Sequence, residues 1–475
     1  MTNINENSKE SSMANSNIVK PNMNNSNMNK TEKNSNEIKN THLSQSLSTT
    51  EKVKLSLNKR HKKEKRFKRI GWLAVLFGFM LVVILIGDIT SKALPAFHQH
   101  WVKIDVDYKS NWLNVDPSSP SDKLALELKK ANYRKVLKNS IYQMFPPQEG
   151  KKLSRKDKRQ LFKIFSTNAE FTIKDSLQAS PADLNKKISV WVRLDDDVDS
   201  YLKEGFPIGT AGLRITEKQA KWIEKLLSTE RIESRFNVSF FTASDSREPE
   251  LAGIKGALTG TLLTMLVTLV LSFPLGVAGA IYLEEFAPKN RWTDLIEINI
   301  NNLAAVPSIV FGLLGLAVII NLFGLPRSAP LVGGIVLTLM TLPTIIIASR
   351  AAIKAVPPSL REAALGLGAS KMQVTFSHVL PQAMPGIITG AIIGIAQALG
   401  ETAPLLMVGM VAFIVDVPTS IVDSATVLPV QIFLWADSPE RAFLAKTSAA
   451  ILVLLSLLLV INVTATLLRS KFEKK

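Results

Sequence analysis

Long apolar runs separated by charged loops dominate the second half of the chain. About 20 apolar residues are needed for a helix to cross the hydrocarbon core of a bilayer. Six stretches approach this length, one of them far upstream of the others. The pattern therefore predicts an all-α polytopic membrane protein with six transmembrane helices, at residues 70–87, 256–283, 303–323, 331–347, 386–415 and 445–468.

Between the first and second runs lies a long polar stretch, residues 90–250, with the mixed charge of a folded domain. Apolar and polar residues alternate along Lys187–Leu194 and Arg235–Phe241, which predicts strands. Thr216 followed by Gln219 is a capping-box pattern that opens a helix. The expected fold is thus a polytopic membrane protein with an inserted α/β domain at 90–250 and a transmembrane domain at 251–475.

The acidic run Asp195–Asp199, "DDDVD", resembles the start of a calcium-binding loop. Its sixth position is Ser200 where such a loop has glycine, and its twelfth is Phe206 where the loop has glutamate. These departures favour a solvated acidic turn over a calcium site.

The first 69 residues are rich in Asn, Ser and Lys and predict a disordered tail, because they cannot bury enough apolar surface to offset chain entropy. Residues 70–89 follow as a transmembrane anchor. Since this run lies far from the start, and "ALPA" at 93–96 is only a weak cleavage signal, we expect the anchor to remain uncleaved.

Charge decides the expected orientation. Six spans place both termini on one side, and short loops on the cytoplasmic side of a membrane carry an excess of Lys and Arg. The two short loops on the other side carry only Arg327 and Arg441. The chain is therefore expected in a bacterial inner membrane, with both termini in the cytoplasm and the domain at 90–250 on the opposite, extracytoplasmic side. The basic residues on the terminal side are ten between Lys52 and Arg69, together with Lys289, Arg291, Arg350, Lys354, Arg361, Lys371, Arg469, Lys471, Lys474 and Lys475.

Composition narrows the class of protein. The chain has 475 residues, 57 Lys and Arg against 40 Asp and Glu, and a net charge of +17. Basic proteins often bind nucleic acid, but here the charge lies beside apolar runs that suit membrane lipid, and no aromatic-rich basic platform accompanies it. The absence of cysteine excludes disulfides, thiolate metal sites and thiol nucleophiles.

The loop between the fourth and fifth spans, residues 357–381, has a specific pattern. Pro357 and Pro358 stop the preceding helix, and Ser359 followed by Glu362 is a capping-box pattern. Glycines 366 and 368 are expected to end this short helix, and Ser370 with Gln373 predicts a second cap. The loop is therefore expected to form a helix–turn–helix on the cytoplasmic surface.

This loop resembles the EAA signature of ABC-importer permeases. The signature residues are Glu362, Ala363, Ala364 and Gly368, followed by Leu380-Pro381, with His378 where the family usually has an aliphatic residue. The resemblance implies that the loop is a coupling helix that docks on a separate ATPase.

Three further stretches are similar to the phosphate-specific importer, in particular its second, PstA-type permease subunit. They are "NLAAVPSIVFGLLGL" (302–316), "GETAPLL" (400–406) and "LPVQIFLWA" (428–436). The resemblance covers residues 251–475 and implies half of a phosphate pore that works by alternating access. It implies four kinds of partner: a second phosphate permease subunit as heterodimer partner, two ATPase subunits, an external phosphate-binding protein and membrane lipid.

The chain has no G-x-x-x-x-G-K-[ST] sequence, so it lacks a P-loop, and ATP is expected to be used by the partner ATPase with no cofactor or metal bound here. The chain is thus expected to be a transport subunit and no enzyme. Two alternatives remain: a permease for another oxyanion such as molybdate or sulfate, and a membrane-anchored phosphate sensor.

Glu401 lies within the run predicted to span at 386–415, three residues before Pro404. A charged side chain inside a membrane is costly, so this carboxylate should face protein or water. It could pair with a cation from a partner subunit or from this chain, where Arg350 is the candidate. It could instead be protonated and donate a hydrogen bond, or cap backbone that Pro404 leaves unpaired.

Five further residues complete the candidates for the pore or substrate path. The resemblance and the hydroxyl or amide chemistry suited to an anion point to Gln397, Thr402, Asn302, Ser308 and Arg350.

Overall fold

The computed structural model describes residues 49–146, 153–205, 214–411 and 413–473. The chain forms two compact units, residues 1–84 and 85–475, and their boundary falls within helix α2 (Thr49–Ala93). Most of the predicted disordered tail lies outside the described residues. The prediction is wrong for residues 49–69, which are helical. This segment contains no Gly or Pro and is rich in Lys and Arg, both of which favour helix.

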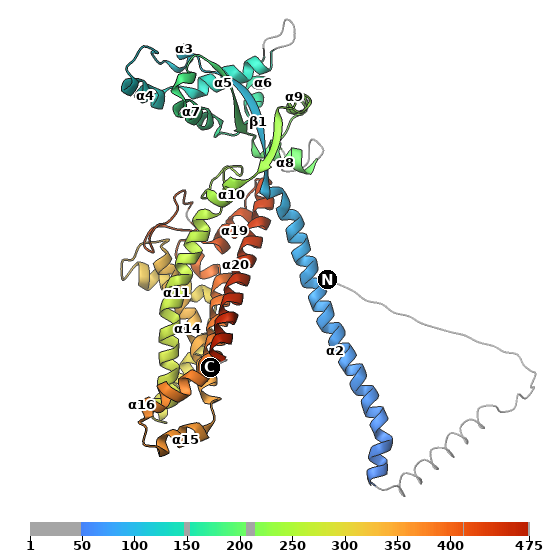
Figure 1. Cartoon of the computed structure of the whole chain (residues 1–475), viewed down its shortest axis with the longest axis vertical. Helices are drawn as coiled ribbons and strands as arrows, with labels where there is room; N and C mark the ends of the chain where they lie inside the picture. Colours follow the sequence, from blue (N-terminus) through green and yellow to red (C-terminus); the bar gives the residue numbers. More distant parts are fainter. Residues whose placement is uncertain (1–48, 147–152, 206–213, 412, 474–475) are drawn as a thin grey trace, which may run out of the picture. The chain divides into compact units, whose positions relative to one another are not determined.

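The second unit begins with an α/β domain (residues 98–236) around a three-stranded antiparallel sheet. The central strand β1 (His98–Asp107) pairs with β2 (Lys187–Arg193) on one side and β3 (Ile232–Phe236) on the other. Figure 1 shows the helices of this domain gathered around β1. They are α3 (Ser110–Leu113), α4 (Ser121–Lys130), α5 (Tyr133–Met144), α6 (Arg155–Phe162), α7 (Ala169–Ala179), η2 (Pro181–Asp183), α8 (Asp196–Glu204) and α9 (Glu217–Ser228).

One hydrophobic core, built from buried residues between Val102 and Leu226, fills this domain. The predicted strand at 187–194 and the capping box of Thr216 and Gln219 are both confirmed. The predicted strand at 235–241 is wrong beyond Phe236, because the Asn237 side chain accepts a hydrogen bond from the Phe240 amide and starts helix α10 (Val238–Thr242). Strand β1 was not anticipated.

Helices make up the rest of the unit. After η1 (Leu94–Phe97) and α10, the chain forms α11 (Lys255–Ile281), the π-helical η3 (Tyr282–Phe286), α12 (Arg291–Ala304), α13 (Ser308–Leu314), the π-helical η4 (Gly315–Ile320) and α14 (Pro330–Lys354). It continues with α15 (Pro358–Gly366), α16 (Lys371–Val374), the π-helical η5 (Thr375–Val379), α17 (Leu380–Gly400), α18 (Ala403–Met407), α19 (Leu428–Ala436) and α20 (Ala442–Glu473).

Among the described residues, five helices are long and apolar enough to cross a membrane, or six if one bent pair counts as a span. The predicted span at 303–323 is wrong as a single straight helix: α12 and the helix that starts at Ser308 meet at 104°. Pro307 explains the break, because proline disfavours helical backbone in the residue before it and cannot donate to the helix ladder.

Small residues allow the membrane helices to pack closely. A Cβ atom at Gly334 of α14 would lie 2.5 Å from Val267 Cβ of α11, and one at Gly390 of α17 would lie 2.4 Å from Ala348 Cβ of α14. Such contacts are possible only without a side chain. They place α14 between α11 and α17. Figure 1 shows α11 and α14 side by side.

The predicted boundary at residue 250, between the α/β domain and the transmembrane domain, is less sharp in the structure. Ala93, Ala96 and Phe240 pack in one cluster with Trp435 of α19 and Ala449 of α20. The segments that lead into and out of the α/β domain therefore belong to the packing of the helical part.

Candidate functional site

The loop at 357–381 forms the predicted helix–turn–helix, with one change at its start. Helix α15 begins at Pro358 with Pro357 as N-cap, so Ser359 lies inside the first turn and the predicted Ser359–Glu362 capping box is wrong. Proline is well suited to the first helical position, where no amide donor is needed. The second predicted cap, Ser370 with Gln373, is confirmed in both of its hydrogen bonds.

The signature residues of this loop are divided between its surface and its core. Ala364 is buried with Ile353 and Val374, whereas Glu362 and Ala363 are exposed. Gly368 takes the left-handed conformation with φ +86°, as expected, and Gly366 is instead the last residue of α15. Leu367 is 90 % exposed, which is unusual for a large apolar side chain. The loop thus presents a surface that carries Glu362, Ala363 and Leu367.

Arg361 fastens this loop to two membrane helices, a role that the sequence reasoning missed. Its guanidinium donates to Glu285 Oε1 at 2.8 and 3.1 Å, at the end of the segment that extends α11. It also donates to the carbonyl oxygens of Ile353 at 2.8 Å and Val356 at 2.7 Å, at the end of α14. The only signal in the sequence was an arginine beside the signature, so its partners were not predictable.

Arg350, a predicted path candidate, binds two carboxylates of this chain. Its Nη2 atom lies 2.5 Å from Glu297 Oε1 and 3.5 Å from Glu284 Oε2. The hypothesis that Arg350 is the counter-ion of Glu401 is therefore wrong. Arg350 instead joins α14 to α12, through Glu297, and to η3 at the end of α11, through Glu284.

Glu401 does not lie inside a helix, so the predicted span at 386–415 is wrong beyond residue 400. Helix α17 ends at Gly400, and Glu401 is its C-cap with extended backbone, φ −78° and ψ 127°. Pro404 explains the end, since it lacks the donor that a continuing helix would need. The Glu401 side chain is half-buried, and its carboxylate has no hydrogen-bond or ion-pair partner in the described part of the chain.

The other path candidates lie near this break on separate segments. Gln397 on α17 and Asn302 on α12 are exposed, while Ser308 and Thr402 are half-buried. Segments α13 and α18 are in contact, because a Cβ atom at Gly312 would lie 2.7 Å from Pro404 Cα. The structure therefore brings the segment of Ser308 beside the segment of Thr402 and Glu401, with Asn302 across the 104° bend.

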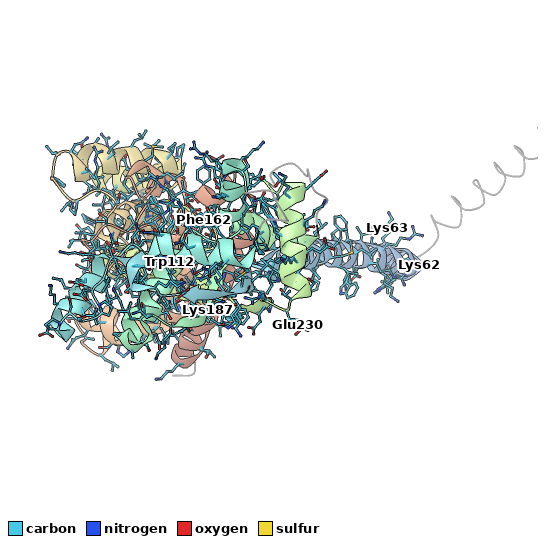
Figure 2. All side chains as sticks on the ribbon, turned by 90° about the horizontal axis from the view of Figure 1, so that it is seen from above. Lys62, Lys63, Trp112, Phe162, Lys187 and Glu230 are labelled. Carbon is cyan, nitrogen blue, oxygen red and sulfur yellow. The ribbon has the colours of Figure 1, made fainter. Side chains whose placement is uncertain are left out.

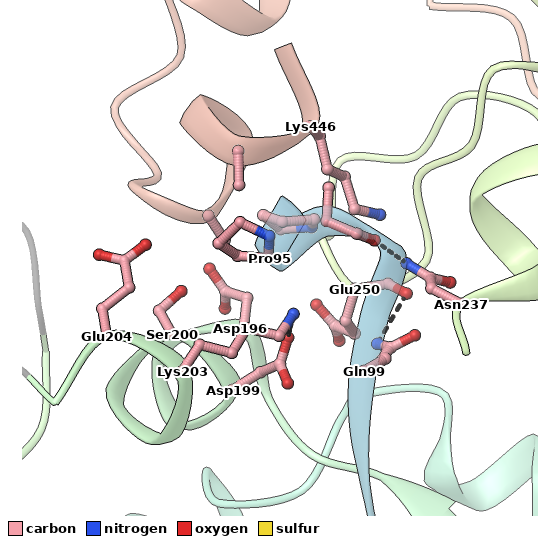
Figure 3. A pocket seen from close by; sticks show the side chains of 14 residues that line it. Pro95, Gln99, Asp196, Asp199, Ser200, Lys203, Glu204, Asn237, Glu250 and Lys446 are labelled. Carbon is pink, nitrogen blue, oxygen red and sulfur yellow. Dashed lines mark hydrogen bonds and ion pairs between the residues drawn. The ribbon is translucent and has the colours of Figure 1, made fainter. Parts of the chain in front are cut away.

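A polar junction connects the α/β domain to the helical part (Figure 3). Gln99 of β1 donates to the Glu250 carbonyl at 3.1 Å, and Ser166 donates to Glu250 Oε1 at 2.6 Å. Lys446, near the start of α20, donates to the Ala252 carbonyl at 2.5 Å. Burial raises the pKa of the Glu250 carboxyl above its usual value. This junction was not anticipated from the sequence.

The run Asp195–Asp199 is not the solvated turn that was predicted, because it starts helix α8 and its residues are half-buried or buried. Asp195 caps helix α8 by accepting from the Asp197 amide at 3.2 Å, and the remaining acids belong to the helix. Burial and neighbouring carboxylates raise the pKa of Asp195 to about 8 and that of Asp196 to about 7. Carboxylate oxygens of Asp195, Asp196 and Asp197 lie within 4.8 Å of one another, the spacing of a metal site.

Asp199 differs from these acids in its surroundings. Burial would raise its pKa, but hydrogen bonds from His100, at 2.9 Å, and from Lys203, at 2.5 Å, hold the pKa below its usual value. It therefore ties β1 to α8 as a carboxylate.

Comparisons with known proteins agree with the membrane helices and the loop. A family described as "Binding-protein-dependent transport system inner membrane component" matches residues 272–474, and a domain of unknown function, DUF3333, matches residues 54–208. The phosphate transport system permease protein PstA 1 of Mycobacterium tuberculosis is 34 % identical over 217 residues, which cover 46 % of this chain and 70 % of that protein.

Two further relatives are similar over the same part. PstA of Yersinia pestis is 31 % identical over 219 residues, or 46 % of this chain and 73 % of that protein. The probable ABC transporter permease YqgI of Bacillus subtilis is 36 % identical over 174 residues, or 36 % of this chain and 58 % of that protein. A solved structure of the MetNI methionine ABC transporter matches 46 % of this chain and 95 % of that chain at 17 % identity, with a TM-score of 0.38.

The helices and the loop define a multi-pass membrane subunit of an ABC importer. The chain belongs to the family of binding-protein-dependent inner-membrane transport components, the permease subunits of these importers. It is a transport subunit and no enzyme, because ATP hydrolysis in such importers is carried out by a partner ATPase. A substrate-binding protein is the other partner of this class.

Proposed function

We propose that this chain forms half of the transmembrane pore of an ATP-driven importer of inorganic phosphate. A second phosphate permease subunit would form the other half, and two ATPase subunits and an external phosphate-binding protein would complete the assembly. Support for phosphate comes from the two PstA relatives, which are phosphate transport system permeases and are each covered over at least two thirds of their length. Both termini would lie in the cytoplasm, as the distribution of Lys and Arg favours.

The observation that supports the mechanism is the attachment of α15. Arg361 binds the ends of α11 and α14 together with α15, so a displacement of the loop moves both membrane helices as one body. We infer that closure of the ATPase acts on the exposed face of Glu362 and Ala363 and tilts these helices around the pore. Alternating access follows if the tilt opens one side of the pore as it closes the other.

Glu401 and its neighbours would line the path at the end of α17. Gln397 and Asn302 are exposed and Glu401 has no partner in the described part of this chain, which fits positions completed by the second permease. Because phosphate is an anion, Glu401 is assigned to a cation of the partner subunit and not to the substrate. Thr402 and Ser308 supply hydroxyl groups beside it.

Uptake by the assembled complex tests the proposal. Vesicles containing both permeases, the ATPase and the binding protein should accumulate radioactive phosphate, and phosphate should stimulate ATP hydrolysis more than molybdate or sulfate does. Preference for either other oxyanion would assign the chain to that substrate. Binding without flux would instead support a sensor.

A charge in the docking surface tests the coupling. Ala363→Asp adds a carboxylate to the exposed face of α15 without touching the buried Ala364. Insertion should be normal and uptake should fall, whereas unchanged uptake would remove the docking role. Lys371→Gln, a second exposed change on the same loop, serves as the control.

A further inference from the structure

Six basic side chains gather on one part of the α/β domain. They lie on α5, on α6 and on the residue after α6, and we call them the basic patch: Arg134, Lys138, Arg155, Lys158, Arg159 and Lys163. All are exposed except Lys138, which is half-buried. Five of them line a cavity of about 450 Å³ together with Tyr142 and Phe162, and Lys163 lines an adjoining cavity that shares Arg134, Arg159 and Phe162. Figure 2 labels Phe162 at this place.

Five of the six basic side chains line a hollow without acidic groups, whereas the adjoining cavity, which Lys163 lines, also contains acidic side chains, among them Asp197. Within the described residues, none of the six forms an ion pair within 4.0 Å, and none of the residues that line the 450 Å³ cavity is acidic. Asp157, on the same helix α6, pairs with Lys218 at 2.7 Å and not with a member of the patch. Arg134 and Arg155 also lie in the first turns of their helices, where the helix dipole disfavours cations.

Aromatic rings hold the patch together. Arg134 Cζ lies 5.9 Å and Lys138 Nζ 5.6 Å from the centre of the Phe162 ring, and Lys158 Nζ lies 5.3 Å from the centre of the Tyr142 ring. Contacts of this kind attract a cation to the face of the ring. They keep three cations directed at one hollow, although like charges repel.

We propose that the basic patch binds phosphate groups, either of a soluble phosphate or of an anionic lipid headgroup. Guanidinium groups present paired donors that match phosphate oxygens, and lysines add charge. The cavity is within the usual size range of small-molecule sites and is larger than one orthophosphate needs, which suits a ligand with several phosphate groups or a larger headgroup. The choice of phosphate over carboxylate rests on the proposed transport function.

Calorimetry on the full chain in phosphatidylcholine nanodiscs tests the site at low ionic strength. The probes are orthophosphate, tripolyphosphate, dihexanoyl phosphatidylglycerol and, as a carboxylate, citrate. At least one phosphate probe should bind, and more weakly as salt is added. Binding of the soluble phosphates identifies one source, and binding of the lipid alone identifies the other.

A charge-matched pair of triple variants locates the binding. Arg134→Gln with Lys158→Gln and Arg159→Gln should weaken it at least about tenfold. The control removes the same charge from exposed lysines elsewhere in the domain, Lys129→Gln, Lys130→Gln and Lys221→Gln, and should bind as the wild type does.

Three results would overturn the proposal: no binding of any phosphate probe, equal loss in both triple variants, or citrate bound as tightly as the best phosphate probe. If the triple variant is not monodisperse, the single Lys158→Gln change gives the same comparison. The measurement reads binding and not flux, so the site can fail while phosphate transport stands, and the reverse.

Discussion

Arg361 offers the sharpest test of how movement reaches the membrane helices. Its four hydrogen bonds join α15 to Glu285 and to the ends of α11 and α14, and the two side chains are only 21 % and 13 % exposed. A hydrogen bond to a charged group contributes about 1.5–3 kcal/mol when formed within a protein. Because both side chains retain some water contact, we expect Arg361→Ala to cost about 3 kcal/mol of loop attachment, roughly a hundredfold.

The consequence should be uncoupling and not failure to fold, since the cost falls on a local contact. In vesicles with the complete importer, Arg361→Ala should still hydrolyse ATP but take up at least about tenfold less substrate per ATP. For Arg361→Lys, the amount of substrate taken up per ATP should lie between that of the wild type and that of Arg361→Ala, because lysine keeps the charge and loses the planar donor pair. All values are normalised to assembled complex.

Two variants make the result specific to the contact. Exchanging the charges, Arg361→Glu with Glu285→Arg, should restore part of the coupling, since the ion pair returns and the carbonyl bonds do not. Lys354→Ala removes an exposed cation at the end of α14 and should be silent. If Arg361→Ala couples as well as Lys354→Ala, the attachment of α15 does not transmit the movement.

Three further predictions concern other parts of the chain. If Glu401 pairs with a cation of the second permease, Glu401→Gln should reduce uptake sharply, because breaking a buried pair from one side costs about 3–5 kcal/mol; near-normal uptake per complex would contradict the pair. The pKa of Asp196 is raised by burial from 3.8 to about 7, so the stability it contributes when protonated is complete below about pH 4 and is lost as pH rises through 7. Thermal melting should therefore show that the difference between wild type and Asp196→Asn changes over this range, while the exposed Asp122→Asn leaves the pH profile unaltered. A Cβ atom at Gly260 would lie 2.0 Å from the Thr426 carbonyl oxygen, so Gly260→Ala should lower the melting temperature, whereas Gly366→Ala, with no atom within 4 Å, should not; equal effects would refute the packing argument.

Features that depend on local signals could be predicted from the sequence. Apolar runs set α11, α14 and α20, since a run of bilayer length has few other structures available. The caps at Thr216 and Ser370 and the left-handed turn at Gly368 were also predictable, because each depends on residues within one helical turn.

Where a membrane helix ends or bends could not be predicted from apolar content, because it depends on contacts between distant segments. From composition alone, the membrane span was predicted to continue through Glu401. In the structure, helix α17 ends at Gly400 and α18 packs against α13. The bend between α12 and α13 was not predicted for the same reason, since hydropathy indicates burial in the membrane but not the direction of a helix. Pro307 and Pro404 indicated a possible break at these two places, but whether a helix kinks or ends at a proline depends on the segments packed around it.

Charged residues show the difference most clearly. Arg361 and Glu285 lie 76 positions apart, and Arg350 and Glu297 lie 53 apart, so no spacing rule relates them. The pKa of Asp195 and that of Asp196 are raised by burial and, in addition, by the negative charge of Glu250, which is distant in the sequence. Local sequence selects helices, caps and turns, whereas pairing and burial of charge arise only when distant segments meet.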